Sequence, residues 1–234
     1  MSEHAPEPST GQGRRAEEVA NWYFRLNGFL QIPGFVLHSE VRRQQISDAD
    51  ILGVRFPFSH ETLHEVRMTD DRWISQSTLP GQVLFVIGEV KVGKCSVNGP
   101  WTDRTRGGME KVIRRIGFAP DEMTREIADS LYNQLVWQND DFAVQYVAIG
   151  AASNHELSTR FRKLKQLVWS DIAAFLFERF TGFGRIKGVP TQWPRFGKDF
   201  ARAIERSEIR HASDATDFVQ RYIELGPQGL RGPQ

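Results

Sequence analysis

The sequence predicts an α/β protein with a central mixed β-sheet flanked by helices and a helical extension at the carboxyl end. Two observations support this class. Segments of helical and strand periodicity follow one another in the order helix, three strands, helices, strand, helices. In addition, residues 83–92 form an apolar run with the length and composition of a buried strand.

The first half predicts one helix and three strands. Residues 14–27 read as a helix because Ala16, Val19, Ala20 and Tyr23 recur at spacings of three and four, and Asn27-Gly28 is a stop signal. We expect strands at residues 35–43 and 50–56, joined into a hairpin by a short polar segment, and a third strand at 83–92. A polar insertion, residues 57–80, separates the hairpin from this third strand.

The second half mixes helices with two further strands. The strands are expected at residues 142–149 and 165–169. The helices are expected at residues 107–116, 120–137, 171–180, 197–207 and 214–225.

Length and composition indicate an ordinary globular chain. The 234 residues suit one domain at residues 14–225, with disordered tails at 1–13 and 226–234. The net charge of +1 is not that of a strongly basic protein. No apolar run approaches the roughly 20 residues that cross a bilayer, so we expect no membrane partner. The single cysteine, Cys95, excludes an intramolecular disulfide and fits a cytoplasmic location.

Candidate chemistry gathers at the end of the third strand. Side chains alternate along a strand, so Glu89 and Lys91 point the same way. Asp50 opens the preceding strand, and pairing of the two strands would bring it to Glu89 at one end of the sheet. Two adjacent carboxylates repel unless one is protonated or a cation lies between them, and Mg²⁺ (or Mn²⁺) suits such oxygen ligands. Asp48 shares the strand parity of Asp50 and remains an alternative ligand.

The first helix supplies one more acid. On a helical wheel Glu17 falls at the edge of the apolar face, near Ala20, whereas its neighbour Glu18 falls on the polar side. Glu17 is therefore the acid that could face inward.

The order helix Glu17, hairpin Asp50, then strand Glu89-Val90-Lys91 resembles the PD-(D/E)xK, or restriction-endonuclease-like, nuclease superfamily, over residues 14–95. The resemblance implies that fold and a metal-dependent nuclease or hydrolase acting on DNA. It would make Asp50 and Glu89 ligands of magnesium, Lys91 the group that positions water, and Glu17 a supporting acid. The 39 residues from Asp50 to Glu89 exceed a plain hairpin, and no Pro-Asp dipeptide precedes the strand.

The turn after this strand offers candidate contacts to nucleic acid. Lys94, Arg104 and Arg106 could bind phosphates, and Trp101 could stack on a base or else simply plug the end of the sheet. Trp169 and Trp193 are expected in the core. The expected partner is DNA, while RNA and a homodimer stay open.

Two other functions compete with the nuclease. The segment His60-Glu61-Thr62-Leu63-His64 matches the His-Glu-x-x-His spacing of zinc peptidases, which requires a helix. The second competitor is a protein of the same fold that binds nucleic acid or a partner without catalysis.

Overall fold

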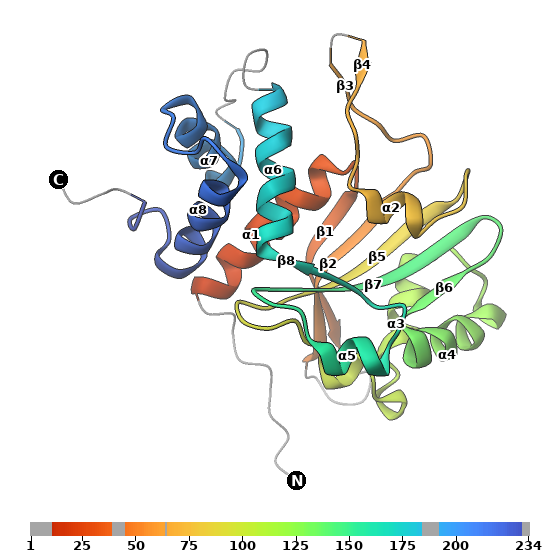
Figure 1. The fold of residues 1–234 in the computed structure, drawn as a ribbon. Coiled ribbons are helices and arrows are strands. Elements are labelled where there is room, and N and C mark those ends of the chain that lie inside the picture. Colours follow the sequence, from red (N-terminus) through yellow and green to blue (C-terminus); the bar gives the residue numbers. More distant parts are fainter. Residues whose placement is uncertain (1–10, 39–44, 64, 184–191, 231–234) are drawn as a thin grey trace.

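A six-stranded mixed sheet forms the centre of the protein (Figure 1). The computed structural model describes residues 11–38, 45–63, 65–183 and 192–230. The strands β1 and β2 pair antiparallel, as do β2 and β5, whereas β5 and β7 pair parallel. Two shorter strands both pair with β7, β6 antiparallel and β8 parallel. The strand bounds are β1 (Leu30–His38), β2 (Gln45–Arg55), β5 (Val83–Val90), β6 (Val136–Gln138), β7 (Phe142–Gly150) and β8 (Lys165–Val168).

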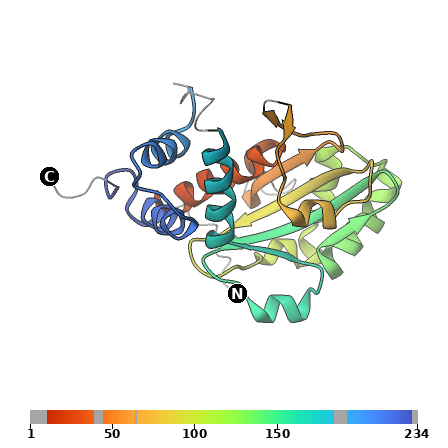
Figure 2. The same cartoon turned by 45° about the horizontal axis from the view of Figure 1, so that its top comes forward.

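Helices cover both faces of this sheet, which confirms the α/β class (Figures 1 and 2). One face packs against α1 (Gly11–Leu26) and α6 (Trp169–Phe183), and α7 (Arg195–Glu205) and α8 (Ala212–Leu225) pack against these two helices. The other face packs against α3 (Gly108–Ile116) and α4 (Thr124–Gln134), which belong to the crossover from β5 to β7. The smaller elements are α5 (His155–Arg160) and the 3₁₀ turns Gly99–Trp101, Arg104–Arg106 and Asp121–Met123.

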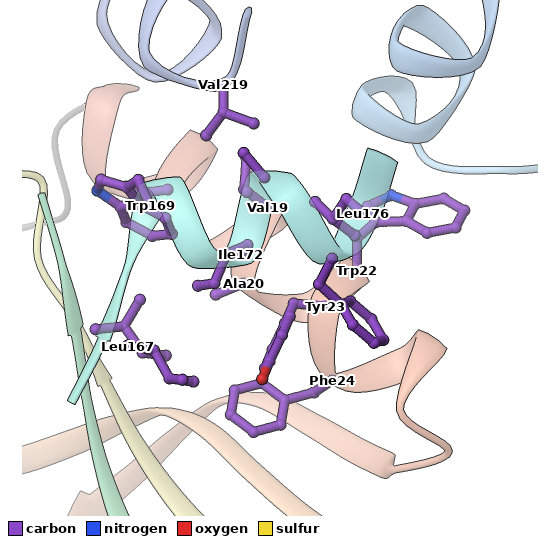
Figure 3. Packing of buried hydrophobic residues seen from close by; sticks show 14 of the residues in the cluster. Val19, Ala20, Trp22, Tyr23, Phe24, Leu167, Trp169, Ile172, Leu176 and Val219 are labelled. Atoms are coloured by element: carbon purple, nitrogen blue, oxygen red, sulfur yellow. The ribbon is translucent and has the colours of Figure 1, made fainter. Parts of the chain in front are cut away.

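The helix α1 is the centre of the larger hydrophobic cluster. Its apolar positions, spaced by three and four residues, are buried as the sequence predicts. Figure 3 shows Val19 and Ala20 facing Ile172 and Leu176 of α6, with Val219 of α8 beside them. Trp169 is buried and Trp193 packs against the same cluster, which confirms both tryptophans as core residues.

The first two strands begin earlier than the sequence predicts. The strand β1 begins at Leu30 and not at 35, and β2 begins at Gln45 and not at 50, so most of the expected polar connection is strand. Residues 39–43 of the expected first strand lie outside the described residues. Backbone pairing such as Val36 with Asp48 overrides the polar composition here. Pro33 is compatible with β1 because this strand lies at the edge of the sheet.

The helix expected at 120–137 is shorter than predicted. It ends at Gln134 because Leu135 adopts a left-handed conformation with φ of 59°, and the next residues form β6 against β7. Strand pairing competes with helical periodicity there and wins.

The insertion at 57–80 contains two short strands, β3 (Thr62–Leu63) and β4 (Val66–Arg67), and the helix α2 (Arg72–Gln76). It is fixed to the fold through Asp70, whose two carboxylate oxygens pair with Arg55 at 2.5 Å and with Arg179 at 2.9 Å. Both arginines are buried, so this charge network holds the insertion against the sheet.

Both ends of the described chain differ from the expected tails. The helix α1 starts at Gly11 rather than at 14, and Leu230, after α8, packs against the larger core cluster. Arg15 joins the two ends by donating hydrogen bonds to the carbonyl oxygens of Ile223 and Glu224. In the described parts of the chain, no helix combines the length and apolarity needed to cross a lipid bilayer.

Replacing Gly197 by alanine tests the contact between α1 and α7. A Cβ atom at this position would lie 2.1 Å from the Trp22 ring, so the two helices must separate. We expect Gly197→Ala to destabilise the protein by about 1 to 3 kcal/mol, although alanine is the better helix former. Urea unfolding measures this loss, and Gly93→Ala, where no atom lies within 4 Å of the added Cβ, is the matched control. Equal stability of both variants would contradict the contact.

Candidate functional site

The carboxylate of Glu89 lies buried at the end of β5. Only 1% of the residue is exposed, so its charge needs partners. Its Oε1 lies 2.5 Å from Nζ of Lys91, and its Oε2 accepts a 3.2 Å hydrogen bond from the hydroxyl of Tyr146 on β7. The predicted alternation therefore places Glu89 and Lys91 on one side, in contact.

Asp50 joins this pair from β2. The register pairs Ile51 with Gly88, so the next residue on each strand, Asp50 and Glu89, lie opposite each other. Oδ2 of Asp50 accepts a 2.6 Å hydrogen bond from the backbone N–H of Val90. The two carboxylates thus meet at one end of the sheet, as the sequence predicts.

Glu17 approaches the same place from α1. Burial raises its pKa to about 7, and the negative charges of Asp50 and Asp48 add to the increase, against the opposing effect of Arg14 and Lys91. Asp48, Asp50 and Lys91 thus act electrostatically on Glu17, and Asp50 and Lys91 also act on Glu89. We call Glu17, Asp48, Asp50, Glu89 and Lys91 the acid–lysine cluster.

Asp50 and Glu89 hold protons unusually tightly. Burial raises the pKa of Asp50 to about 6, although the Val90 hydrogen bond and Lys91 oppose the increase. Burial likewise raises the pKa of Glu89 to about 7, with Lys91 opposing and Asp50 adding. For Lys91, burial alone would lower the pKa, but Glu89, Asp50 and Asp48 outweigh this and raise it. Lys91 therefore stays protonated while the acids titrate near neutral pH.

The structure also distinguishes the two candidate aspartates. Asp50 contacts the backbone of β5 directly, whereas Asp48 pairs with Val36 on the outer strand β1. Asp48 still raises the pKa of Glu17 and of Asp50. Asp50 is therefore the aspartate whose side chain binds β5, and Asp48 acts on the cluster through its charge.

Metal-binding capacity at this place rests on two carboxylates. In the described residues, no group of three or more His, Cys, Asp or Glu side chains is arranged to hold a metal ion. A magnesium ion is compatible with two carboxylates, because it usually keeps several water ligands.

The candidate nucleic-acid contacts differ in how exposed their side chains are. Trp101 is fully buried in the second core cluster and packs against Tyr146 with ring centroids 6.1 Å apart, so the prediction that it stacks on a base is wrong. Arg104 is exposed but bound to Asp129 and to Asn133.

Two contact candidates remain at the surface. Arg106 is exposed and pairs with Asp103 at 3.3 Å. Lys94 is exposed beyond β5, and its backbone bridges to Ala152 after β7. Lys94 is thus the candidate that lies closest in sequence to the cluster.

The zinc-peptidase hypothesis loses its structural premise. Residues 62–63 and 66–67 form the paired strands β3 and β4, so the helix that this motif requires is not formed. His60 is exposed, and Glu61 lies 3.9 Å from Arg179. His64 lies outside the described residues.

Tyr146 is the site residue that sequence reasoning missed. It is fully buried, and burial together with the Glu89 charge raises its pKa well above its ordinary value, so its hydroxyl remains a donor. A tyrosine inside an apolar strand reads as core, and only its register with Ile87, two residues before Glu89, could have pointed to this role.

Comparisons with protein-family models, with curated proteins and with solved structures gave no match for this chain. The geometry of the acid–lysine cluster is therefore the feature that indicates a function.

The raised pKa values predict that the stability of the metal-free protein decreases as the pH rises. A carboxyl whose pKa is higher in the folded state binds protons more tightly there, so stability is lost between about pH 4 and pH 7. Asp50→Asn removes one such charge and keeps an acceptor for the Val90 N–H. We expect its stability relative to wild type to rise by about 1 to 2 kcal/mol from about pH 4.5 to pH 8.

Urea unfolding in the presence of a chelator, at both pH values, measures this change. The exposed Asp141→Asn is the matched control and should show no such pH dependence. A constant difference between Asp50→Asn and wild type would show that Asp50 is not strained by burial.

For Tyr146→Phe, the stability relative to wild type should fall, rather than rise, as the pH increases. Its hydroxyl donates to the Glu89 carboxylate, so its loss costs more when Glu89 is ionised than when it is protonated. The same unfolding measurements should show a destabilisation about 1 kcal/mol greater at about pH 8 than at pH 4.5. Equal destabilisation at the two pH values would mean that the hydroxyl does not stabilise the charge.

Proposed function

We propose that this protein is a divalent-metal-dependent nuclease that hydrolyses phosphodiester bonds in DNA and has a restriction-endonuclease-like core. The observation that carries the proposal is the meeting of Asp50 and Glu89 beside Lys91, from two strands far apart in sequence. Glu17 on α1, Asp50 on β2, Glu89 on β5 and Lys91 just after β5 follow one another in the order of the family motif. These four residues also influence one another's protonation.

The donor set fits magnesium. Asp50 and Glu89 offer hard carboxylate oxygens, which Mg²⁺ or Mn²⁺ prefers, and the charge of Asp50 raises the cost of ionising Glu89. A positive ion beside them would relieve this cost. When bound, such an ion would lower the pKa of water and neutralise charge on the phosphoryl group.

Lys91 is the proposed catalytic cation. Its ammonium group is half-buried and held by Glu89, so it is oriented in a site of low dielectric, where charge acts strongly. In the proposed reaction it positions the attacking water and stabilises the negative charge that develops on the phosphate.

Two further residues support this chemistry. Glu17, with a pKa of about 7, can take up or release a proton near neutral pH. Tyr146 orients the Glu89 carboxylate through its hydroxyl and acts as a positioning residue.

A second candidate function is binding of nucleic acid without cleavage. One observation favours it: Oε1 of Glu89 already contacts Lys91, and Oδ2 of Asp50 already accepts from Val90. In a binding protein these contacts would be permanent and structural.

Cleavage assays decide between the two. With Mg²⁺ or Mn²⁺, we expect wild type to cleave at least one of four substrates: supercoiled DNA, linear DNA, single-stranded DNA or RNA. The cleavage rate of Lys91→Ala should be lower by about a hundredfold or more. Asp50→Asn should lose the activity and also the increase in melting temperature that the metal produces in wild type. The exposed Lys163→Ala is the control for a lost lysine.

The possible results separate the hypotheses. Salt-dependent binding by wild type without cleavage of any substrate would support the binding protein. Cleavage by Lys91→Ala at the wild-type rate would remove Lys91 from the mechanism.

A further inference from the structure

The outer side of α7 carries four basic residues. Arg195, Lys198, Arg202 and Arg206 are spaced by three, four and four residues, so they lie along one side of the helix. The opposite side is buried in the larger core cluster. The basic side of α7 therefore faces away from the core.

These residues line a hollow in the surface. The hollow has a volume of about 340 Å³ and also includes Asp199, Glu208 and residues after α8. Its four basic and two acidic side chains give a net charge of +2, that is, four minus two. We call it the α7 groove.

The acidic residues only partly neutralise the groove. Arg195 pairs with Asp199 at 3.2 Å, and Arg206 pairs with Glu208 at 3.7 Å. Both arginines are more than half exposed, so a stronger anion can replace these pairs at little cost. Arg202 is exposed and has no side-chain partner among the residues that the structure describes.

The groove is fixed to the helix that carries Glu17. The neighbouring Glu18 accepts a 2.9 Å hydrogen bond from the N–H of Phe196 at the start of α7. Its other oxygen accepts a 2.7 Å hydrogen bond from the hydroxyl of Tyr222 on α8. One turn of α1 therefore carries Glu17 of the acid–lysine cluster and, at the next residue, the contacts that hold α7 and α8.

We infer that the α7 groove binds the sugar–phosphate backbone of the nucleic acid whose cleavage is proposed above. From Arg195 to Arg206 the basic side extends about 16 Å at ~1.5 Å per residue. This length matches about five nucleotides of a strand at ~3.4 Å per step. Lysine and arginine contacts of this kind bind phosphates without reading bases, so the groove contributes affinity and not sequence specificity.

This inference rests on the proposed function, and a binding assay without metal separates the two. Fluorescence anisotropy with a short DNA duplex, single-stranded DNA and an RNA duplex, in chelator, measures affinity without turnover. The test variant is Lys198→Gln/Arg202→Gln. The control is Arg114→Gln/Arg115→Gln, which removes two exposed arginines of α3.

For Lys198→Gln/Arg202→Gln we expect an affinity for DNA about tenfold lower at low salt. The slope of log affinity against log salt concentration should decrease by about 2, because two phosphate contacts are lost. The control should keep the wild-type slope, and both variants should keep the wild-type melting temperature.

Three results would overturn the inference: no binding of any nucleic acid by wild type, a wild-type slope in the test variant, or the same loss in the control. Cleavage is measured separately. If the test variant loses binding and wild type does not cleave, the inference about the α7 groove stands and the nuclease function is refuted. Cleavage by wild type with unchanged binding by the variant would do the reverse.

Discussion

The buried carboxylate of Glu89 is the constraint on which this end of the molecule depends. An ionised group with 1% exposure is costly unless charge and hydrogen bonds compensate for lost water. Lys91 supplies the charge and Tyr146 the hydrogen bond, yet the pKa of Glu89 still rises to about 7 because burial outweighs both. A core that needed only stability would place an apolar residue here. The retained acid is therefore an argument that this strand end does chemistry.

The helix α1 connects this costly site to the rest of the protein. Glu17 belongs to the acid–lysine cluster, whereas Glu18 binds α7 and α8, so adjacent residues serve opposite sides of the helix. Trp22 and Tyr23 of the same helix make close aromatic contacts with Trp193 and with Phe175 of α6. Packing at this density has few alternative arrangements. The position of Glu17 relative to β2 and β5 is thereby fixed by residues that take no part in the site.

The sequence predicts the site better than its surroundings. Alternation along an apolar strand is a local signal, and it was enough to place Glu89 and Lys91 together. Longer-range effects escaped prediction: β1 begins at Leu30 because of its pairing with β2, and the helix before β6 ends at Leu135 because the next residues pair with β7. Tyr146 and the burial of Trp101 likewise depend on contacts between distant segments. A single sequence carries no signal for such contacts between distant segments.

An acidic site that acts on a polyanion meets an electrostatic difficulty. Four carboxylates in one cluster repel a phosphodiester, and Lys91 alone does not cancel them. The net charge of +1 offers no general attraction for nucleic acid either. Attraction must then come from a local excess of positive charge held at a fixed position relative to the cluster. The α7 groove meets both conditions, since its charge is +2 and Glu18 attaches it to the helix of Glu17. The distribution of charge, rather than its sum, thus makes a near-neutral protein compatible with a nucleic-acid substrate.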